Sequence, residues 1–305
     1  MTDLEIILVD DGSTDGSVQK MAQSADYDDH RIRIFSQKNQ GAAATRNLGL
    51  SHARGQWINF LDADDLLHPE KLQHQLNELE DSPGLMMIGG AWSRFYDTPP
   101  KVPQVRADAL WQEHSPQSWL ATALEHNLMM QPAAWLVSAC LTKKAGPWND
   151  ALTLNDDGEY FARMMLATDR VGFCAKALSF YRSGITSSLS AGSSPEHFDS
   201  AFTAMSLISQ NLLAVSSETS VHHALACAWS RLAVESYPNA PEVSERCEEN
   251  AKQYGEFTPN VGGRWLTRLS RPLGWRAARR LQSTVYALGY RHYGLKRAKK
   301  KVIDV

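Results

Sequence analysis

Apolar runs and helical stretches alternate along residues 4–90 of this chain. A continuous apolar run that ends in a turn is typical of a buried strand, and an apolar residue every three or four positions is typical of a helix packed on a sheet. The predicted strands are residues 4–9, 31–35, 57–61 and 85–88. Three helices are predicted between them: the first ends near residue 25, and the other two span residues 42–52 and 69–80. This order predicts an α/β fold with a mainly parallel sheet covered on both faces.

The pattern changes near residue 194. Before it, we expect a strand near the sheet edge at residues 133–138, a helix at 157–167 and short strands at 171–175 and 178–181. From residue 195 to about residue 254 the pattern is wholly helical. We therefore predict three parts: an α/β domain over residues 1–194, a helical region over 195–263 and a basic amphipathic tail over 264–305.

Cysteine spacing and hydropathy exclude several classes of protein. The 4 cysteines are far apart and form no CxxC pair, which argues against a zinc site and a disulfide framework and suits a reducing compartment. The N-terminus has no basic region followed by an apolar one, and no run approaches the ~20 apolar residues of a spanning helix. We therefore expect a cytoplasmic protein.

The net charge of −3 hides an uneven distribution of charge. Residues 264–301 contain 12 Lys and Arg and no acidic residue, whereas the rest of the chain has 19 basic and 34 acidic residues. Aromatic and Leu residues interleaved with these charges favour a segment that lies on an anionic membrane surface. The alternative is a helical tail that packs on the acidic body. Because no nucleic-acid-binding module is recognised, we expect no nucleic acid partner.

Three carboxylates follow the predicted strand at residues 57–61, at Asp62, Asp64 and Asp65. Open α/β sheets bind ligands at the carboxyl ends of their strands, and carboxylate oxygens suit a hard divalent cation shared with phosphates. The run therefore indicates a metal–diphosphate site. The alternative is a polar turn in which Asp65 caps the helix that Pro69 helps to start.

Three further motifs contain charged residues. The turn Asp10-Asp11-Gly12-Ser13 ends the first predicted strand, and an ionised Asp there can accept hydrogen bonds from a base or ribose. Arg46 lies in the helix that follows Asn39-Gln40-Gly41 and can pair with an anion, although a surface arginine is the plainer alternative. Asp156 and Asp157 precede a helix, where carboxylates either favour its positive end or supply a general base.

The order of these motifs resembles glycosyltransferase family 2. The shared features are a strand ending in VDDGSTDGS, then NQGAAATRNLG, then FLDADD, then an acidic pair with Arg163 seven residues after Asp156. The resemblance covers residues 4–188 and implies the GT-A nucleotide-sugar-binding fold. It also implies transfer of one sugar from a nucleotide-diphosphate donor, such as a UDP-sugar, to a hydroxyl of a glycan or lipid-linked acceptor, with inversion and with Mn²⁺ or Mg²⁺ as cofactor.

The resemblance assigns a role to each motif. In the donor site, Asp11 is expected at the nucleotide base, Arg46 near the nucleotide or diphosphate, Asp62 at the nucleotide sugar and Asp64 on the metal. On the acceptor side, Asp157 is expected to be the general base and Asp156 to help position the acceptor. Family members usually have Glu where Asp156 stands. A peripheral position at the inner face of the cytoplasmic membrane would suit a lipid-linked acceptor.

Two departures from the family pattern leave other functions open. The family normally opens with a further strand and helix before the strand at residues 4–9, and their absence would leave a sheet edge open. A non-catalytic protein that only binds a nucleotide or a partner is therefore the alternative. The absence of a QxxRW motif favours single addition over processive synthesis. A nucleotidyltransferase is a third hypothesis, but we find no glycine-rich, lysine-bearing phosphate loop.

Overall fold

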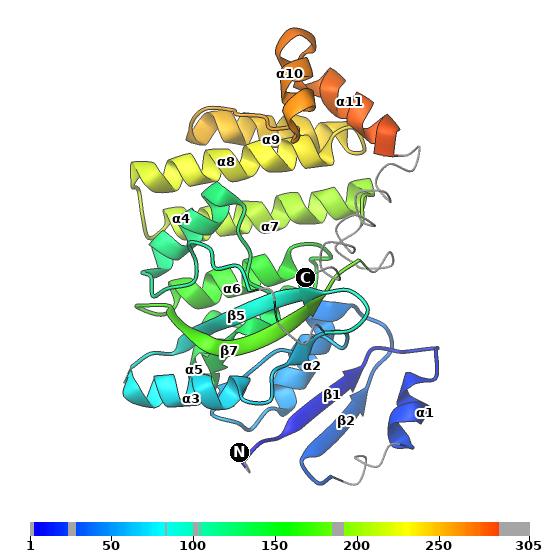
Figure 1. Cartoon of the computed structure of the whole chain (residues 1–305), viewed down its shortest axis with the longest axis vertical. Helices are drawn as coiled ribbons and strands as arrows, with labels where there is room; N and C mark the ends of the chain where they lie inside the picture. The colour runs from blue at the N-terminus through cyan, green and yellow to red at the C-terminus, as the bar shows by residue number, and fades with distance from the viewer. Residues whose placement is uncertain are drawn as a thin grey trace.

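A computed structural model of the chain describes residues 3–23, 29–82, 84–99, 103, 105–184 and 192–286 (Figure 1). The strands are β1 (Ile6–Asp10), β2 (Ile32–Ser36), β3 (Trp57–Ile58), β4 (Leu66–Leu67), β5 (Met87–Phe95), β6 (Leu136–Ser138) and β7 (Gly172–Arg182). The helices are α1 (Ser17–Ala22), α2 (Ala42–His52), α3 (Lys71–Asp81), α4 (Pro116–His126), α5 (Ala139–Ala145), α6 (Asp156–Leu166), α7 (Pro195–Leu213), α8 (Thr219–Ser236), α9 (Pro241–Tyr254), α10 (Arg264–Leu273) and α11 (Trp275–Val285), with a 3₁₀ turn at Pro132–Ala134.

The strands form two sheets, a parallel pair and a larger sheet that contains both parallel and antiparallel pairings. Strands β1 and β2 form a parallel pair, and a five-stranded sheet has the order β3-β6-β5-β7-β4. Within it, β5 and β7 are parallel, whereas the short pairings β3–β6, β5–β6 and β4–β7 are antiparallel. The α/β class is therefore confirmed. The expectation of a mainly parallel sheet is right for the two longest pairings and wrong for the three short ones, because an apolar run carries no record of strand direction.

Four predicted strands differ clearly from the observed ones. The run 57–61 forms a ladder only at Trp57–Ile58, since the Asn59 side chain then donates to the carbonyl oxygens of Ala133 and Trp135. The strand expected near the sheet edge at residues 133–138 forms only at Leu136–Ser138, after the 3₁₀ turn, and lies next to the edge strand β3. The two short strands expected at residues 171–181 form the single strand β7, whose register against β5 shifts between Gly90 and Ala91.

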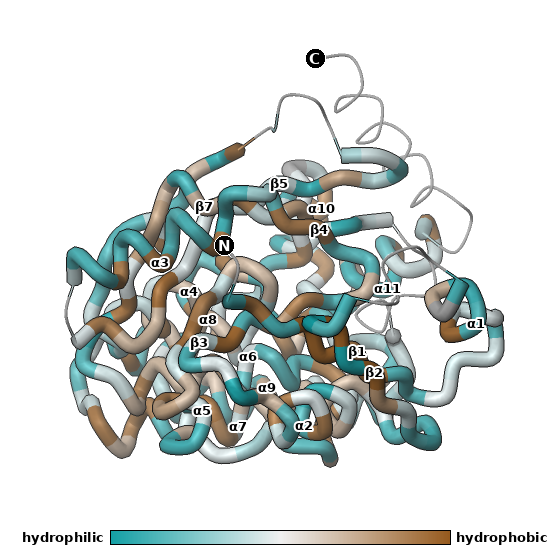
Figure 2. The backbone as a smooth tube through the Cα atoms, turned by 90° about the horizontal axis from the view of Figure 1, so that it is seen from below, coloured by the Kyte–Doolittle hydropathy of each residue, from teal (hydrophilic) through white to brown (hydrophobic). Residues whose placement is uncertain are grey.

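The β1–β2 pair is the least covered part of the sheet structure. No residue of either strand is fully buried, and Ile6 is 46% exposed. Figure 2 shows hydrophobic positions in both strands next to α1. Among the described residues, β1 pairs with β2 on one side and with no strand on the other. The expectation of an open sheet edge therefore holds in this part of the molecule.

The sheet and the C-terminal helices share one hydrophobic core. A single cluster of buried side chains includes Trp135 after the 3₁₀ turn, Phe161 of α6, Met205 of α7 and Trp229 of α8. In Figure 1, helices α7, α8 and α9 stack in a layer beyond α4 and α6, while α3 covers the β5–β7 ladder from the other side. The boundaries predicted at residues 194 and 263 stay predictions.

The basic tail begins as two helices. Helix α10 ends at Gly274, which has a left-handed φ of 78°, and α11 starts at once after it. Residues 287–305 of the predicted tail lie outside the described residues. No helix in the described part of the chain is long and apolar enough to cross a bilayer.

Lys71 is an unusual member of the core beneath α3. Its side chain is 0% exposed and its ammonium lies 3.5 Å from the carbonyl oxygen of Trp135. Burial lowers the pKa of Lys71 to about 7, because the charged form has lost its hydration. The folded protein therefore binds this proton less tightly than the unfolded chain does.

Stability should consequently rise as the pH increases from 7 towards 10. In this window the unfolded chain keeps the Lys71 proton and the folded chain releases it, which raises the free energy of unfolding by up to ~1.4 kcal/mol per pH unit. Denaturant unfolding of the native protein and of Lys71→Met at several pH values measures this. The variant should lack the added slope; equal slopes in both proteins would contradict the prediction.

Candidate functional site

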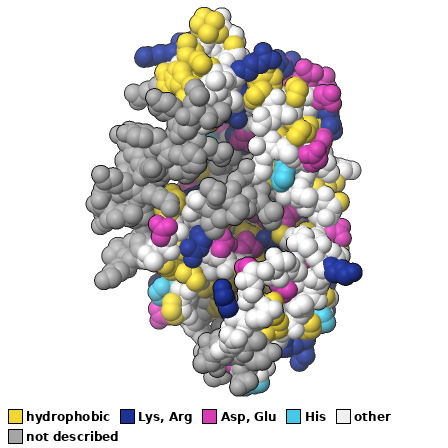
Figure 3. Space-filling view, turned by 90° about the vertical axis from the view of Figure 1, so that its right-hand side faces the viewer, with side chains coloured by type: hydrophobic (Ala, Val, Ile, Leu, Met, Phe, Trp, Pro, Cys, Tyr) yellow, Lys and Arg dark blue, Asp and Glu magenta, His cyan; other side chains and the backbone are white. Residues whose placement is uncertain are grey.

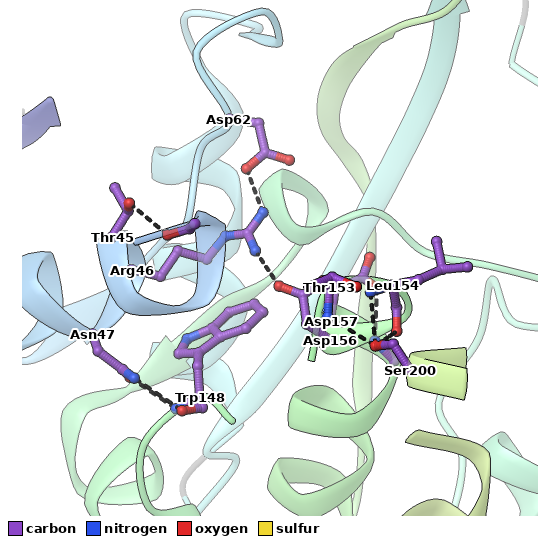
Figure 4. Close-up of polar contacts among 12 residues, drawn as sticks. Thr45, Arg46, Asn47, Asp62, Trp148, Thr153, Leu154, Asp156, Asp157 and Ser200 are labelled. Carbon is purple, nitrogen blue, oxygen red and sulfur yellow. Dashed lines mark hydrogen bonds and ion pairs between the residues drawn. The ribbon is translucent and has the colours of Figure 1, made fainter. Parts of the chain in front are cut away.

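Arg46 joins two of the acidic motifs. It lies in α2, which begins after Gly41, a residue with a left-handed φ of 90°. Its Nη2 donates to Asp62 Oδ1 at 2.7 Å and its Nη1 donates to Asp156 Oδ2 at 2.8 Å (Figure 4). The Arg46 side chain is only 16% exposed, so the alternative of a surface arginine is wrong. One guanidinium thus holds together the end of the β3 segment and the start of α6.

Trp148 supports the guanidinium from below. The Arg46 Cζ lies 4.5 Å from the centroid of the indole ring, which in turn stacks on Tyr160 at 4.0 Å. Asn47 fixes the Trp148 backbone, accepting from its N–H at 2.8 Å and donating to its carbonyl at 2.9 Å (Figure 4). Trp148 is not among the expected site residues, since a lone tryptophan between helices gives no sequence signal of a partner 102 positions away.

The start of α6 is held in place by the helical region. Asp156 and Asp157 form its first turn, after Asn155 with a φ of 61°. Ser200 of α7 accepts from the backbone N–H groups of Thr153 at 2.8 Å and Leu154 at 3.1 Å (Figure 4). Helix α7 therefore positions the loop that leads to the acidic pair. Nothing in the local pattern around Ser200 indicated this contact.

The site raises the pKa of Asp157. Burial is the largest cause and the negative charge of Asp156 adds to it, while Arg46 opposes both. For Arg46, burial lowers the pKa, but the Asp62 and Asp156 carboxylates outweigh it and the guanidinium stays firmly charged. A carboxylate with a raised pKa is a stronger proton acceptor than an ordinary one. Figure 3 shows acidic and basic side chains together in a hollow of the molecular surface.

The turn after β3 contains one exposed carboxylate and one buried carboxylate. The Asp64 side chain is exposed, whereas Asp65 is 4% exposed. Asp65 Oδ1 accepts from the backbone N–H of Arg182 at 2.8 Å, while its Oδ2 is buried without a hydrogen-bond partner. Burial raises the pKa of Asp65 to about 7. Asp65 therefore ties the turn to the end of β7; it does not cap α3, whose N-terminal residue Glu70 makes no side-chain cap.

Arg182 is a third residue of the site that no sequence pattern indicated. Its Nε donates to the Asp64 carbonyl at 3.0 Å, and its Nη1 donates to the carbonyls of Tyr96 at 3.2 Å and Asp97 at 3.3 Å. The guanidinium also lies 4.5 Å from the centroid of the Phe95 ring. Arg182 therefore fastens the backbone of the acidic turn to the ends of β5 and β7.

The donor set suits a cation that is shared with a ligand. In the described ranges, no group of three or more His, Cys, Asp and Glu side chains is placed to hold a metal ion. Magnesium and manganese are commonly bound by one or two carboxylates, with phosphate oxygens and waters completing the shell. An exposed Asp64 carboxylate beside Asp62 fits this mode and does not fit a closed site made by protein alone.

Asp11 organises the start of α2. Its Oδ1 accepts from Gln37 Nε2 at 2.7 Å and from the Gln40 N–H at 2.9 Å, and its Oδ2 accepts from the Gly41 N–H at 2.8 Å. Burial favours the neutral form, but these hydrogen bonds outweigh it and the pKa of Asp11 lies below its usual value. Asp11 thus lies at the first turn of the helix that carries Arg46. Its expected contact with a nucleotide base stays a prediction.

Replacing Arg46 with Lys should destabilise the protein. An ammonium is a single point charge and cannot reproduce two hydrogen bonds from the two ends of a planar fork. We expect the free energy of unfolding to fall by about 1.5–3 kcal/mol, the typical value of a hydrogen bond to a charged group. Chemical unfolding measures this, with Arg54→Lys as the control because Arg54 is exposed. Equal stability of both variants would show that the bridge contributes little.

Comparison with known proteins identifies the family of the N-terminal part. Residues 1–135 match the family described as Glycosyl transferase family 2. An uncharacterized glycosyltransferase of Haemophilus influenzae is 47% identical over 74 residues, covering 24% of this chain and 30% of that protein. The putative glycosyltransferase EpsH of Bacillus subtilis is 38% identical over 98 residues, covering 32% of this chain and 28% of EpsH. The chain thus spans less than a third of these two relatives.

Solved structures show the same fold. The crystal structure of S. aureus TarS 1-349 in complex with UDP has a TM-score of 0.59 at 15% identity, covering 92% of this chain and 82% of that one. The complex of TarS 1-349 with UDP-GlcNAc has a TM-score of 0.55 at 15% identity and covers 85% of each chain. Residues 1–135 of the chain thus match glycosyltransferase family 2, and its fold is the GT-A fold.

Proposed function

We propose that the protein is an inverting, metal-dependent glycosyltransferase. It would move one sugar from a nucleotide-diphosphate donor, most simply a UDP-sugar, to a hydroxyl of a glycan or lipid-linked acceptor. The observation that carries this proposal is the Arg46 bridge, whose guanidinium donates to Asp62 at 2.7 Å and to Asp156 at 2.8 Å. The neighbouring carboxyl group, Asp157, has a pKa that burial raises. Family membership and the likeness to TarS, whose crystals contained UDP and UDP-GlcNAc, support the same donor class.

On the donor side, the proposal assigns four residues. Asp11 lies at the start of α2 and would accept hydrogen bonds from the base, and Asp62 would accept from the nucleotide sugar. Arg46 would lie near the diphosphate, with its charge secured by Asp62 and Asp156. Asp64 is exposed and would hold the divalent cation, Mn²⁺ or Mg²⁺, together with phosphate oxygens. When bound, the cation supplies positive charge that stabilises the departing diphosphate.

On the acceptor side, Asp157 would be the general base. It would take the proton from the acceptor hydroxyl as that oxygen bonds to the anomeric carbon, while the bond from this carbon to the diphosphate oxygen breaks on the opposite face. Attack and departure on opposite faces invert the anomeric configuration. Asp156 would help to position the acceptor, since Arg46 fixes its Oδ2 and leaves its other oxygen free of that bridge.

The location that we propose is the inner face of the cytoplasmic membrane, reached through the basic segment 264–301. The excess of 12 basic residues without an acidic one supports attraction to an anionic surface. Nucleic acid is not a proposed partner. A lipid-linked acceptor would be presented at the same surface.

Release of UDP tests the transferase proposal. The full-length protein is incubated with individual UDP-sugars, Mn²⁺ and a membrane extract that supplies acceptors, and free UDP is measured. We expect release that depends on both the metal and the extract and on one class of sugar. No release with any donor, from a protein that is folded by circular dichroism, would overturn the proposal.

A non-catalytic binding protein is the second candidate. Two observations favour it: β1 has a free edge in the described part of the chain, and both carboxylate oxygens of Asp11 are taken by the protein's own groups. Calorimetric titration with UDP distinguishes the two candidates when it is combined with the release assay. Metal-dependent binding without turnover would favour the binding protein, whereas binding with turnover would favour the enzyme.

A further inference from the structure

Helix α10 is amphipathic, but most of its apolar face is not buried. At 3.6 residues per turn, its apolar positions fall on one arc of roughly 120° and its arginines on the adjoining arc. The apolar positions are Trp265, Leu266, Leu269, Pro272 and Leu273. Of these only Leu266 is fully buried, at 4% exposure, while Trp265 is 51% and Leu273 60% exposed. A globular helix normally turns such a face to the core, so this exposure requires an explanation.

Helix α11, in contrast, is anchored to the helical region. Trp275 packs edge-on against Tyr237 and Phe257, and Ala278 is buried in a small cluster with Val234 and Val261. Its basic residues are engaged as well. Arg276 pairs with Glu248 of α9 at 2.8 Å, and Arg279 donates to the carbonyls of Val234 and Tyr237 at 3.0 and 3.1 Å. For α11, packing on the acidic body is therefore the observed arrangement.

Two arginines of α10, Arg268 and Arg271, lack such partners in the described part of the chain. Arg268 and Arg271 are exposed, and within the described ranges neither makes an ion pair. In Figure 3, hydrophobic and basic side chains lie together at the top, over the end of the molecule that carries α10 and α11. Figure 1 places this end opposite the β1–β2 pair. An apolar face flanked by free arginines, at an extremity of the molecule, has the composition of an element that lies in a membrane interface.

We infer that α10 is the membrane-docking element of this protein, with Trp265 and Leu273 entering the headgroup region and Arg268 and Arg271 contacting anionic headgroups. Helix α11 packs on the helical region and thereby attaches α10 to it. The inference deepens the peripheral location proposed above and rests on it, but it does not require the chain to transfer a sugar. The inference gives the two helices of the tail different roles, because membrane insertion is assigned to α10 alone among the described helices.

Vesicle flotation with the full-length protein tests this assignment. The probes are vesicles of phosphatidylcholine with and without about one third phosphatidylglycerol. We expect the native protein to float with the anionic vesicles and to be released by high salt, since the screening length falls to ~3 Å at 1 M. Loss of the two arginines in Arg268→Gln/Arg271→Gln should lower the partition coefficient by roughly 30-fold, about fivefold for each charge. Trp265→Ala/Leu273→Ala should lower it by roughly tenfold or more.

Matched controls separate α10 from the rest of the surface. Val215 and Leu281 are also exposed, at 50% and 42%, and Leu281 lies on α11. The double variant Val215→Ala/Leu281→Ala should float like the native protein, as should Lys38→Gln/Arg106→Gln, which removes two exposed charges elsewhere. Equal flotation of the α10 variants and the controls would overturn the assignment.

Two other occupants of the α10 face give distinct outcomes. If a second copy covers it, the native protein elutes as a dimer without lipid and Trp265→Ala/Leu273→Ala elutes as a monomer. If residues 287–305 cover it, vesicle binding stays absent in the native protein and the α10 variants lose stability. Either outcome contradicts membrane docking. Binding of UDP should be the same in the native protein and the α10 variants, so failure of the docking inference is distinguishable from failure of the transferase proposal.

Discussion

Asp157→Asn should lower the rate of sugar transfer by about 10²–10⁴-fold, the usual contribution of a positioned general base. The amide has nearly the size of the carboxyl but cannot take a proton from an acceptor hydroxyl. The fold should survive, because the change removes one negative charge from a partly buried acidic pair and leaves the two Arg46 contacts intact. Single-turnover measurement of UDP release with a soluble acceptor, once the donor is known, gives the rate.

The same assay should show a pH dependence that belongs to Asp157. Burial raises the pKa of Asp157, so the working carboxylate is present above that pKa and is lost as the pH falls through it. The value of kcat/KM should therefore fall at a higher pH than an ordinary carboxyl would give. In Asp157→Asn this fall at acidic pH, the acid limb of the profile, should be absent from the residual rate.

Asp156→Asn is the matched control for the general base. It keeps Asp157 and alters its neighbour, whose negative charge is the second cause of the raised pKa. We expect a smaller loss of rate and an acid limb displaced to lower pH. If Asp156→Asn abolished transfer while Asp157→Asn kept it, the base would be Asp156, and the proposed division of labour would be wrong.

Asp64→Asn should remove the effect of Mn²⁺ on UDP binding. Asp64 is the exposed carboxylate of the turn, and loss of a charged ligand in a charge-paired site costs ~2–5 kcal/mol, equivalent to roughly 30- to 4,000-fold in affinity. The residual affinity should equal that of the native protein without metal. Calorimetric titration with UDP, with and without Mn²⁺, measures all four values.

A control at a distant carboxylate completes this experiment. Asp81 ends α3, is exposed and makes no ion pair among the described residues. Asp81→Asn changes the net charge by the same amount and should leave UDP binding and its metal dependence untouched. Metal-dependent binding that persists in Asp64→Asn would show that another group holds the cation. Binding that is equal with and without Mn²⁺ in the native protein would remove the metal from the proposal.

The sequence alone was sufficient for the α/β class, for most elements and for the family. Helix α2 spans residues 42–52 as predicted, because an Ala-rich stretch after Gly41 has few other options. The motifs around Asp11, Arg46, Asp62 and Asp156 were recognisable from their order along the chain. That order is a property of the sequence and does not depend on how the elements pack. The break at Gly274 likewise has a local cause, because glycine readily adopts the left-handed φ of 78° that ends α10.

Contacts between distant segments could be decided only by the tertiary structure. Arg46 taken alone indicated a surface arginine, and only the tertiary fold brings Asp62 and Asp156 to one guanidinium. Trp148, Ser200 and Arg182 gave no signal because each acts on a partner far away in the chain. Strand direction, the neighbours of β6 in the sheet and the exposure of α10 have the same origin. Periodicity records which side of an element is apolar, but the element that covers that side, or leaves it open, is chosen by the packing of the whole chain.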